Sequence, residues 1–152
     1  MKFLGLDIAT KTGFALLDES GIIEYGKVGL NPKQTHIERF QDFRQQIKDL
    51  VLRLQPDVII LEDTYSKFVA TTTYLNRLGG IAIGVLPDKI KLIIGRVSTM
   101  RSQLVHKQTK EAVFEWAVAE FKLDDLDFKK DNDITDAVLL AVWGMSDYKK
   151  GQ

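Results

Sequence analysis

The chain has 152 residues, 45% of them hydrophobic, and we expect a single domain over residues 1–152 with a sizeable core. Its 21 Lys and Arg balance 21 Asp and Glu, and the absence of cysteine excludes disulfides and thiolate metal sites. It has no signal-peptide layout and no apolar run near the roughly 20 residues of a membrane span, which predicts a cytoplasmic protein without membrane contact.

Three strands with short connections are predicted at the start of the chain. The apolar segment 2–9 is followed by segments 12–19 and 22–30, and only brief turns separate them. Short connections of this kind favour antiparallel hairpins. We therefore expect three meandering strands.

A helix and a buried strand are predicted next. Residues 35–54 carry apolar side chains at the spacing of an amphipathic helix, and Thr35 with Glu38 has the pattern of a capping box. Residues 57–62 are apolar until Glu62, which is typical of a strand covered on both faces in a parallel sheet.

The remaining elements are predicted to alternate between helix and strand. In chain order they are a helix at 70–85, a strand at 90–97, a helix at 109–121, an acidic loop at 124–132 and a helix at 133–147. The order β-β-β-α-β-α-β-α-α predicts an α/β fold, with a mixed sheet that carries helices on its faces.

Four carboxylates stand out because each lies at the end of a predicted element: Asp7, Glu62, Asp133 and Asp136. Buried carboxylates repel one another and lose hydration, so they are rarely tolerated together without a cation. The economical explanation is a site for hard divalent cations, Mg²⁺ or Mn²⁺.

Each of these carboxylates also has a simpler explanation. Asp7 interrupts an apolar strand and is placed to cap the turn that follows, while Glu62 simply ends its strand. Asp133 and Asp136 are both placed to favour the positive N-terminus of the last helix, and Asp133 is also placed to be its N-cap. This explanation is weaker for Asp136, which lies on the same side of the helix and leads into an apolar run, so we expect it near the buried face.

Charge is unevenly distributed along the chain. Residues 89–110 contain six Lys and Arg and no acidic residue, whereas residues 124–136 contain six Asp and two Lys. A zero net charge counts against binding to nucleic acid, but this distribution suits a phosphate-binding surface beside a metal site. Ordinary variation of the surface is the alternative.

Three motifs together resemble the RuvC-like Holliday-junction resolvases of the RNase H-like superfamily. They are Gly5-Leu6-Asp7 in the first strand, Ile59-Ile60-Leu61-Glu62 in the fourth, and Asp133-Ile134-Thr135-Asp136-Ala137 in the last helix. The resemblance spans nearly the whole chain. In its compact form the chain is similar to resolvases encoded by bacteriophages. It implies an RNase H-like five-stranded mixed sheet of order 3-2-1-4-5, with strand 2 antiparallel, flanked by helices.

The resemblance also implies an activity in DNA recombination and repair. The protein would be an endonuclease that resolves four-way and other branched DNA by paired nicks and leaves 5′-phosphate and 3′-hydroxyl ends. Asp7, Glu62, Asp133 and Asp136 would hold two Mg²⁺ ions, or Mn²⁺, and Lys110 would offset charge in the transition state. The family acts as homodimers, and the helix at 70–85 is our candidate interface. The sequence identifies no helicase or branch-migration partner.

DNA contacts are expected from two groups of residues. Phosphate contacts are assigned to Lys107, Lys110, Arg96 and Arg101, although each lysine is equally compatible with a solvated surface. Tyr65 and Phe68 follow the fourth strand, where the family stacks an aromatic ring on an unpaired base. Phe68 is as compatible with a core position.

Three alternative functions remain open at this point. A related nuclease would cut RNA precursors, and a binding module would recognise branched DNA without cutting it. Sugar-kinase and actin-like ATPases share an Asp-containing first strand, but they need two such domains and the chain is too short for both.

Overall fold

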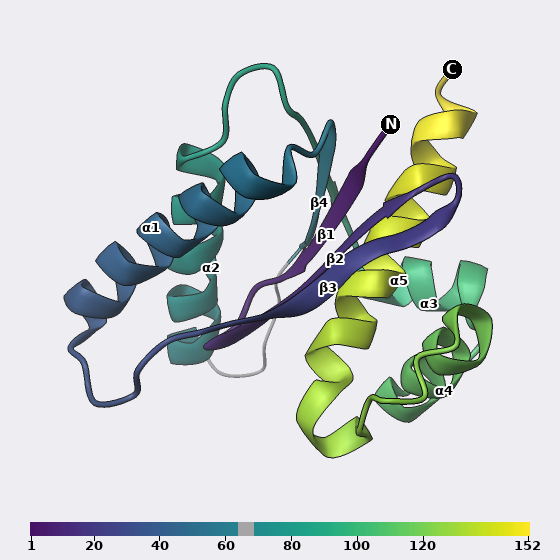
Figure 1. The fold of residues 1–152 in the computed structure, drawn as a ribbon. Coiled ribbons are helices and arrows are strands. Elements are labelled where there is room, and N and C mark those ends of the chain that lie inside the picture. Colours follow the sequence, from purple (N-terminus) through teal and green to yellow (C-terminus); the bar gives the residue numbers. More distant parts are fainter. Residues whose placement is uncertain (64–68) are drawn as a thin grey trace.

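The computed structural model describes residues 1–63 and 69–152, which fold around a five-stranded sheet (Figure 1). The strands are β1 (Phe3–Asp7), β2 (Lys11–Asp18), β3 (Gly21–Gly29), β4 (Val58–Glu62) and β5 (Lys91–Gly95). Their order is β3-β2-β1-β4-β5, with β2 antiparallel to both neighbours and β1, β4 and β5 mutually parallel. The predicted strand order and the antiparallel second strand are therefore confirmed.

Helices cover both faces of the sheet. The described residues form α1 (His36–Leu54), α2 (Val69–Gly84), α3 (Val97–Leu104), α4 (Lys110–Phe121) and α5 (Phe128–Lys150). Helices α1 and α2 lie on one face, and α3, α4 and α5 lie on the other (Figure 1). Within the described ranges, no helix is both long and apolar enough to cross a membrane.

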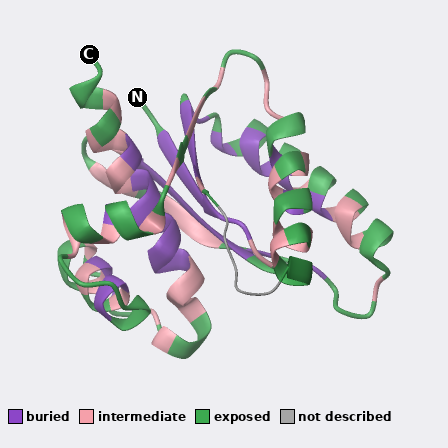
Figure 2. Cartoon of the chain, turned by 180° about the vertical axis from the view of Figure 1, so that it is seen from behind, coloured by how far each residue is buried: buried purple, intermediate pink, exposed green. Residues whose placement is uncertain are grey.

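The sequence of β1 is almost continuously apolar because its side chains alternate between two faces of the sheet that are both covered by helices. Leu4 and Leu6 pack in the core on the side of α1 and α2, whereas Phe3 packs on the opposite side with α3 and α5. All five residues of β1 are buried as a result. Figure 2 shows this concentration of buried residues in the central strands and in α5.

Helix α5 lies unusually close to the sheet because two glycines face it. A Cβ atom added to Gly5 would lie 2.1 Å from the carbonyl oxygen of Ala137, and one added to Gly13 would lie 2.0 Å from that of Asp133. Neither position has room for a side chain. The start of α5 is thereby held directly over β1 and β2, a contact that positions the site described below.

The start of helix α5 differs from the prediction. Helix α5 begins at Phe128 rather than 133, because the Asp127 side chain accepts a hydrogen bond from the Lys130 N–H and caps the helix. The predicted acidic loop at 124–132 is therefore helical from Phe128, and Asp133 is an interior helical residue rather than an N-cap.

Helix α3 was not predicted at all. Its eight residues bury only Met100, and its N-cap, Arg96, makes no side-chain capping bond, so the sequence carries neither a broad apolar stripe nor a capping signal. The capping box at the start of α1 is confirmed. The Thr35 hydroxyl accepts from the Glu38 N–H at 3.2 Å, and the Glu38 carboxylate accepts from the Thr35 N–H at 2.7 Å.

Candidate metal centre

The four carboxylates singled out in the sequence line one pocket of about 260 Å³, which we call the carboxylate pocket. Lys110 and Arg101 line it as well. Leu6 of β1 pairs with Leu61 of β4, so Asp7 and Glu62 are the next residues on two parallel neighbouring strands. Because side chains alternate along a strand, both point to the face covered by α5. Asp63 belongs to the opposite side and is exposed.

Helix α5 supplies the other two carboxylates. Asp133 and Asp136 are three residues apart, which places both on one side of the helix. The close contact between Gly13 and the Asp133 main chain sets this turn of α5 over the sheet, at the end of β1 that carries Asp7. Asp136 is buried at 8% exposure, as is Asp7.

Lys110 provides positive charge inside the pocket. It is the first residue of α4, whose N-cap is Thr109, and its Nζ lies 3.2 Å from Oδ2 of Asp136. Its Nζ also lies 3.5 Å from Oδ1 of Asn132. The other carboxylate oxygen of Asp136, Oδ1, is buried and has no hydrogen-bond partner in the described chain. Such an oxygen is costly unless a ligand satisfies it.

Burial and mutual repulsion disfavour the ionised form of the carboxyl groups in the pocket. Burial, and then the charges of Asp136, Glu62 and Asp133, raise the pKa of Asp7 well above its usual value. Burial likewise raises the pKa values of Glu62 and Asp136, although Lys110 and Arg101 partly oppose this. Partial burial disfavours the charge on Lys110, but the carboxylates outweigh it and raise the pKa of Lys110, so this side chain remains cationic.

These properties fit a hard divalent cation. Carboxylate oxygens are the ligands that Mg²⁺ and Mn²⁺ prefer, and a cation would satisfy the orphaned oxygen of Asp136. Among the residues at 1–63 and 69–152, no three acidic or histidine side chains are already arranged to hold an ion. Some of the carboxylates would therefore have to change rotamer to hold an ion, whereas Oδ1 of Asp136 is free to bind one while Oδ2 stays with Lys110.

We expect the stability of the metal-free protein to fall as pH rises from about 5 to 8. Carboxyls with raised pKa values bind protons more tightly in the folded than in the unfolded state, so their contribution is lost once pH passes their ordinary values of 3.8 and 4.5. Saturating Mg²⁺ should remove this decline because it binds the ionised groups. Melting temperatures measured across this range, with EDTA or Mg²⁺, test the expectation. A metal-free profile that rises towards pH 8 would contradict it.

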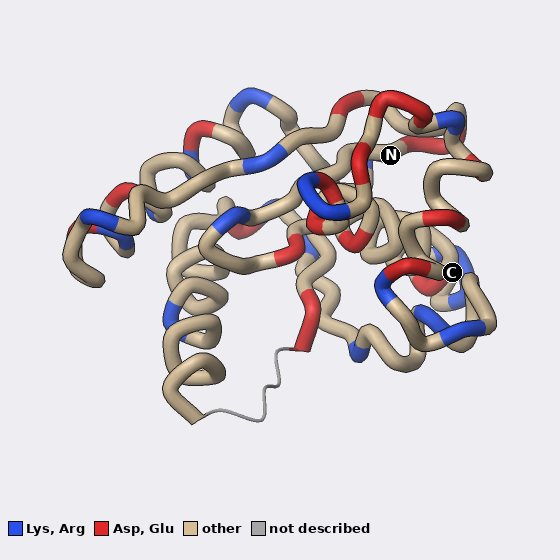
Figure 3. The backbone as a smooth tube through the Cα atoms, turned by 90° about the horizontal axis from the view of Figure 1, so that it is seen from below, with Lys and Arg blue, Asp and Glu red and all other residues tan. Residues whose placement is uncertain are grey.

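Lys and Arg occur along many elements of the described chain (Figure 3). Of the predicted DNA contacts, Lys110 and Arg101 line the carboxylate pocket, whereas Arg96 and Lys107 are exposed and lie outside its lining. Arg101 is held by a bond from its Nη1 to the Gln108 carbonyl at 2.9 Å, and its buried Nε has no partner in the described chain. The remaining two, Tyr65 and Phe68, lie outside the described residues.

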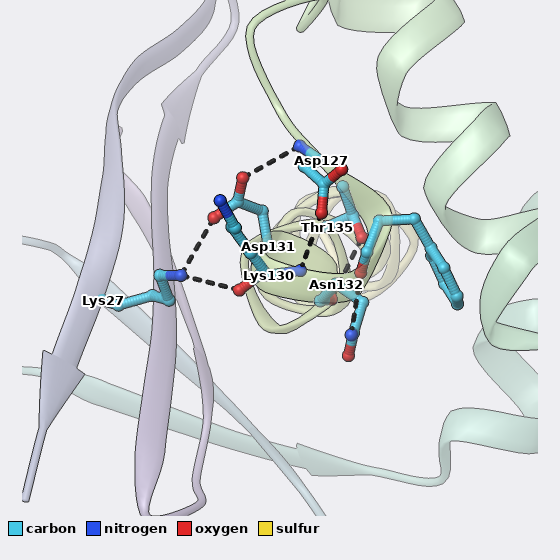
Figure 4. A network of polar contacts seen from close by, with 7 residues as sticks. Lys27, Asp127, Lys130, Asp131, Asn132 and Thr135 are labelled. Carbon is cyan, nitrogen blue, oxygen red and sulfur yellow. Dashed lines mark hydrogen bonds and ion pairs between the residues drawn. The ribbon is translucent and has the colours of Figure 1, made fainter.

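A network that the sequence did not reveal fixes the first turns of α5 (Figure 4). Lys27 of β3 donates from Nζ to Oδ1 of Asp131 at 2.9 Å and to the Lys130 carbonyl at 2.6 Å. Oδ2 of Asp131 accepts from the Asp127 N–H at 2.9 Å, which completes a reciprocal cap. The only signal in the sequence was the pair Asp127 and Asp131, within the segment interpreted as a loop.

Replacing Lys27 by Met removes its bonds to the first turns of α5, so Asp133 is expected to shift by less than about 1 Å. A full misplacement of about 1 Å of a catalytic group can lower kcat by about 10²-fold, and we therefore expect kcat of the cleavage proposed below to fall by up to about 10-fold. KM should change little, and the exposed ion pair should contribute at most about 1 kcal/mol to stability. Arg53→Met is the matched control, because Arg53 pairs with Glu24 at 2.7 Å and ties β3 to α1 instead. Steady-state kinetics of both variants test this; equal kcat values would remove the positioning role.

Comparison with known proteins places the chain by its structure rather than by its sequence. The sequence matches no family model and no curated protein. The structure matches Thermus thermophilus RuvC with a TM-score of 0.77 at 14% identity, covering 99% of this chain and 97% of that one. RuvC of the same organism in complex with a Holliday junction substrate matches with a TM-score of 0.78 at 14% identity, over 93% and 90% of the two chains.

The resemblance extends to resolvases from other sources. The fowlpox virus Holliday junction resolvase matches with a TM-score of 0.59 at 16% identity, over 97% of this chain and 99% of that one. The protein thus has an RNase H-like fold. Over nearly its whole length, it has the form of this fold seen in RuvC and other Holliday junction resolvases.

Proposed function

We propose that this protein is a metal-dependent endonuclease that resolves four-way DNA junctions by paired strand nicks. The observation that carries the proposal is the meeting of Asp7, Glu62, Asp133 and Asp136 in one pocket of a resolvase-like fold. A module that only bound branched DNA would gain nothing from four carboxylates turned towards phosphate. Their burial raises the pKa values of three of them, so a cation has a clear reason to bind there.

In the proposed reaction, water attacks the scissile phosphorus, the bond to the 3′ oxygen breaks, and a 5′-phosphate and a 3′-hydroxyl remain. Bound Mg²⁺ or Mn²⁺ supplies Lewis-acid stabilisation of the attacking and leaving oxygens. The ions would be held by four ionised carboxylates, those of Asp7, Glu62, Asp133 and Asp136. Lys110 and Arg101 place positive charge beside the phosphate oxygens, whose negative charge increases in the transition state.

Replacing Lys110 by Met is expected to lower kcat for junction cleavage by about 10²-fold, because it removes a cation from the pocket. Lys107→Met is the matched control, since it removes the same charge three residues earlier, at an exposed position outside the pocket lining. Single-turnover cleavage of a labelled four-way junction measures both. Equal losses in the two variants would reduce the role of Lys110 to general attraction of DNA.

Two symmetric nicks require two copies of this pocket, and we propose a homodimer built on α2. Cβ atoms added to Gly79, Gly80 and Gly84 would meet nothing within 4 Å, so this side of α2 has room for a second helix. Ile83 and Ile94, beside these glycines, are 41% and 51% exposed. Light scattering should give twice the chain mass, and Gly80→Arg should give a monomer. A monomeric wild-type protein would remove this part of the proposal.

Cleavage assays test the main proposal. The wild-type protein should nick synthetic four-way DNA in Mg²⁺ and not in EDTA. Three-way and flap DNA, linear duplex and RNA serve as competing substrates. Cutting of linear duplex as fast as the junction would remove junction selectivity, and preferential cutting of RNA would favour the RNA-precursor alternative. Tight junction binding without any cleavage would favour the binding module.

A further inference from the structure

A second hollow, of about 550 Å³, adjoins the carboxylate pocket and has no role in the proposed chemistry. We call it the aromatic hollow. Its lining comes from the turn after β1, the first turns of α1 and the first turns of α2, namely Ala9, Thr10, His36, Arg39, Ala70, Thr71, Tyr74 and Leu75. A volume of this size lies within the range of sites for small organic groups, about 300–1,000 Å³.

Aromatic rings form one side of this hollow. The His36 and Tyr74 ring centroids are 5.2 Å apart, and Phe40 lies 5.7 Å from Tyr74 behind them. His36 is exposed, so its ring is accessible from solvent. Aromatic platforms of this kind stack unpaired bases without regard to sequence, because every base has a π-face.

Arg39 adds a fixed positive charge. Its Nε donates to the Gln34 carbonyl and its Nη2 to the Pro32 carbonyl, each at 3.0 Å. Main-chain carbonyls orient the guanidinium without neutralising it, and no ion pair to Arg39 occurs within the described residues. The lining of the hollow contains no acidic residue, in contrast to the four in the carboxylate pocket. The charge is therefore suited to a phosphate group.

The carboxylate pocket and the aromatic hollow share part of their lining. Ala9 and Leu75 line both of them, so the aromatic hollow lies directly beside the carboxylate pocket, at the distance of a neighbouring group rather than elsewhere on the surface. A DNA strand carries a phosphate and a base at every nucleotide. When one phosphate is bound by the carboxylate pocket, the hollow presents a ring and a cation to a neighbouring nucleotide.

We propose that the aromatic hollow binds an unpaired nucleotide of the strand being cut, with its base against His36 and Tyr74 and its phosphate near Arg39. The inference rests on the proposed function, because it requires the cut strand to lie in the carboxylate pocket. Duplex DNA keeps its bases stacked and paired, whereas the crossover of a four-way junction can release one. The hollow thus gives a physical reason for selecting junctions over linear duplex.

Photo-crosslinking tests the location directly. Four-way junctions with 5-iododeoxyuridine at successive positions around the crossover are bound to the full-length Asp7→Asn protein, irradiated and analysed by mass spectrometry. One position should crosslink to His36 or Tyr74. Linear duplex with the same substitution should not crosslink there.

Binding measurements provide the second readout. His36→Ala should weaken junction binding by roughly fivefold or more, the loss expected for one stacked base, whereas Ile37→Ala, at a neighbouring residue that is 69% exposed, should not. Arg39→Gln should lower the slope of log affinity against log salt by about 0.7 to 1, the value for one phosphate contact. Arg44→Gln, which removes the same charge outside the hollow, is its control.

The outcomes separate this inference from the proposed function. Normal cleavage, with no crosslink at His36 or Tyr74 and with variants that bind like their controls, would overturn the nucleotide site and leave the nuclease intact. Crosslinking in the hollow of the Asp7→Asn protein, together with a wild-type protein that binds junctions but never cuts them, would retain the site and remove the nuclease. Failure to bind junctions at all would overturn both.

Discussion

Replacing Asp7 by Asn is expected to reduce junction cleavage by at least about 10²–10³-fold, because weaker binding of the cation removes its stabilisation of transition-state charge. The substitution preserves shape but removes the charge of the most perturbed carboxyl in the pocket. Junction binding should persist, because phosphate contacts come from other residues. Metal affinity should fall, since a neutral amide is a weaker ligand for a hard cation.

The same change should stabilise the metal-free protein. Asp7 is buried among like charges, and neutralising such a functional group commonly adds about 0.5–2 kcal/mol. In a chain of about this length, each 1 kcal/mol raises the melting temperature by roughly 2–4 °C. Asp63→Asn is the control, because Asp63 is exposed on the other side of the strand end. Undiminished cleavage by Asp7→Asn, or a loss of stability in EDTA, would count against the assignment.

Replacing Gly13 by Ala is expected to destabilise the protein by about 3 kcal/mol or more, at the upper end of the cost of overpacking. The new Cβ would lie 2.0 Å from the carbonyl oxygen and 2.3 Å from the carbonyl carbon of Asp133, and neither main-chain atom can rotate away. Helix α5 would have to lift from the sheet. Because Asp133 and Asp136 move with it, cleavage should fall even at temperatures where the variant remains folded.

Gly29→Ala is the matched control for this prediction. Gly29 lies in β3 of the same sheet, pairs with Lys11 of β2, and has nothing within 4 Å of its added Cβ. Its stability should change by less than about 0.5 kcal/mol. Urea unfolding of both variants, together with cleavage rates well below their melting temperatures, tests the difference. If Gly13→Ala has wild-type stability and rate, close packing of α5 does not position the site.

The sequence predicted the sheet well because its signals were local. An uninterrupted apolar run marked β4, brief turns marked the β1–β2–β3 meander, and Thr35 with Glu38 marked the start of α1. Helix α3 was not predicted because its short sequence has no such local signal: it buries a single residue, Met100. The true start of α5 was missed because Asp127 and Asp131 were interpreted as loop carboxylates rather than as reciprocal caps.

The candidate site was accessible from the sequence only in part. Asp7 and Glu62 were exceptional for being acidic at the ends of apolar strands, so each was recognisable alone. That Lys110 reaches Asp136 while Lys107 stays outside the pocket depends on where α4 begins and how it packs on α5. The aromatic hollow depends on the approach of α1 to α2, which no local pattern encodes.

The pairing of Lys110 with Asp136 has a consequence for metal uptake. The Lys110 ammonium group already serves as counter-ion to this carboxylate, so it would repel a Mg²⁺ ion held at the unpartnered Oδ1 and weaken its binding. A Lys110→Met protein should accordingly hold its ions more tightly while cutting more slowly. If the proposed function holds, the wild-type lysine would lower the affinity for the metal ion and increase the rate of cleavage.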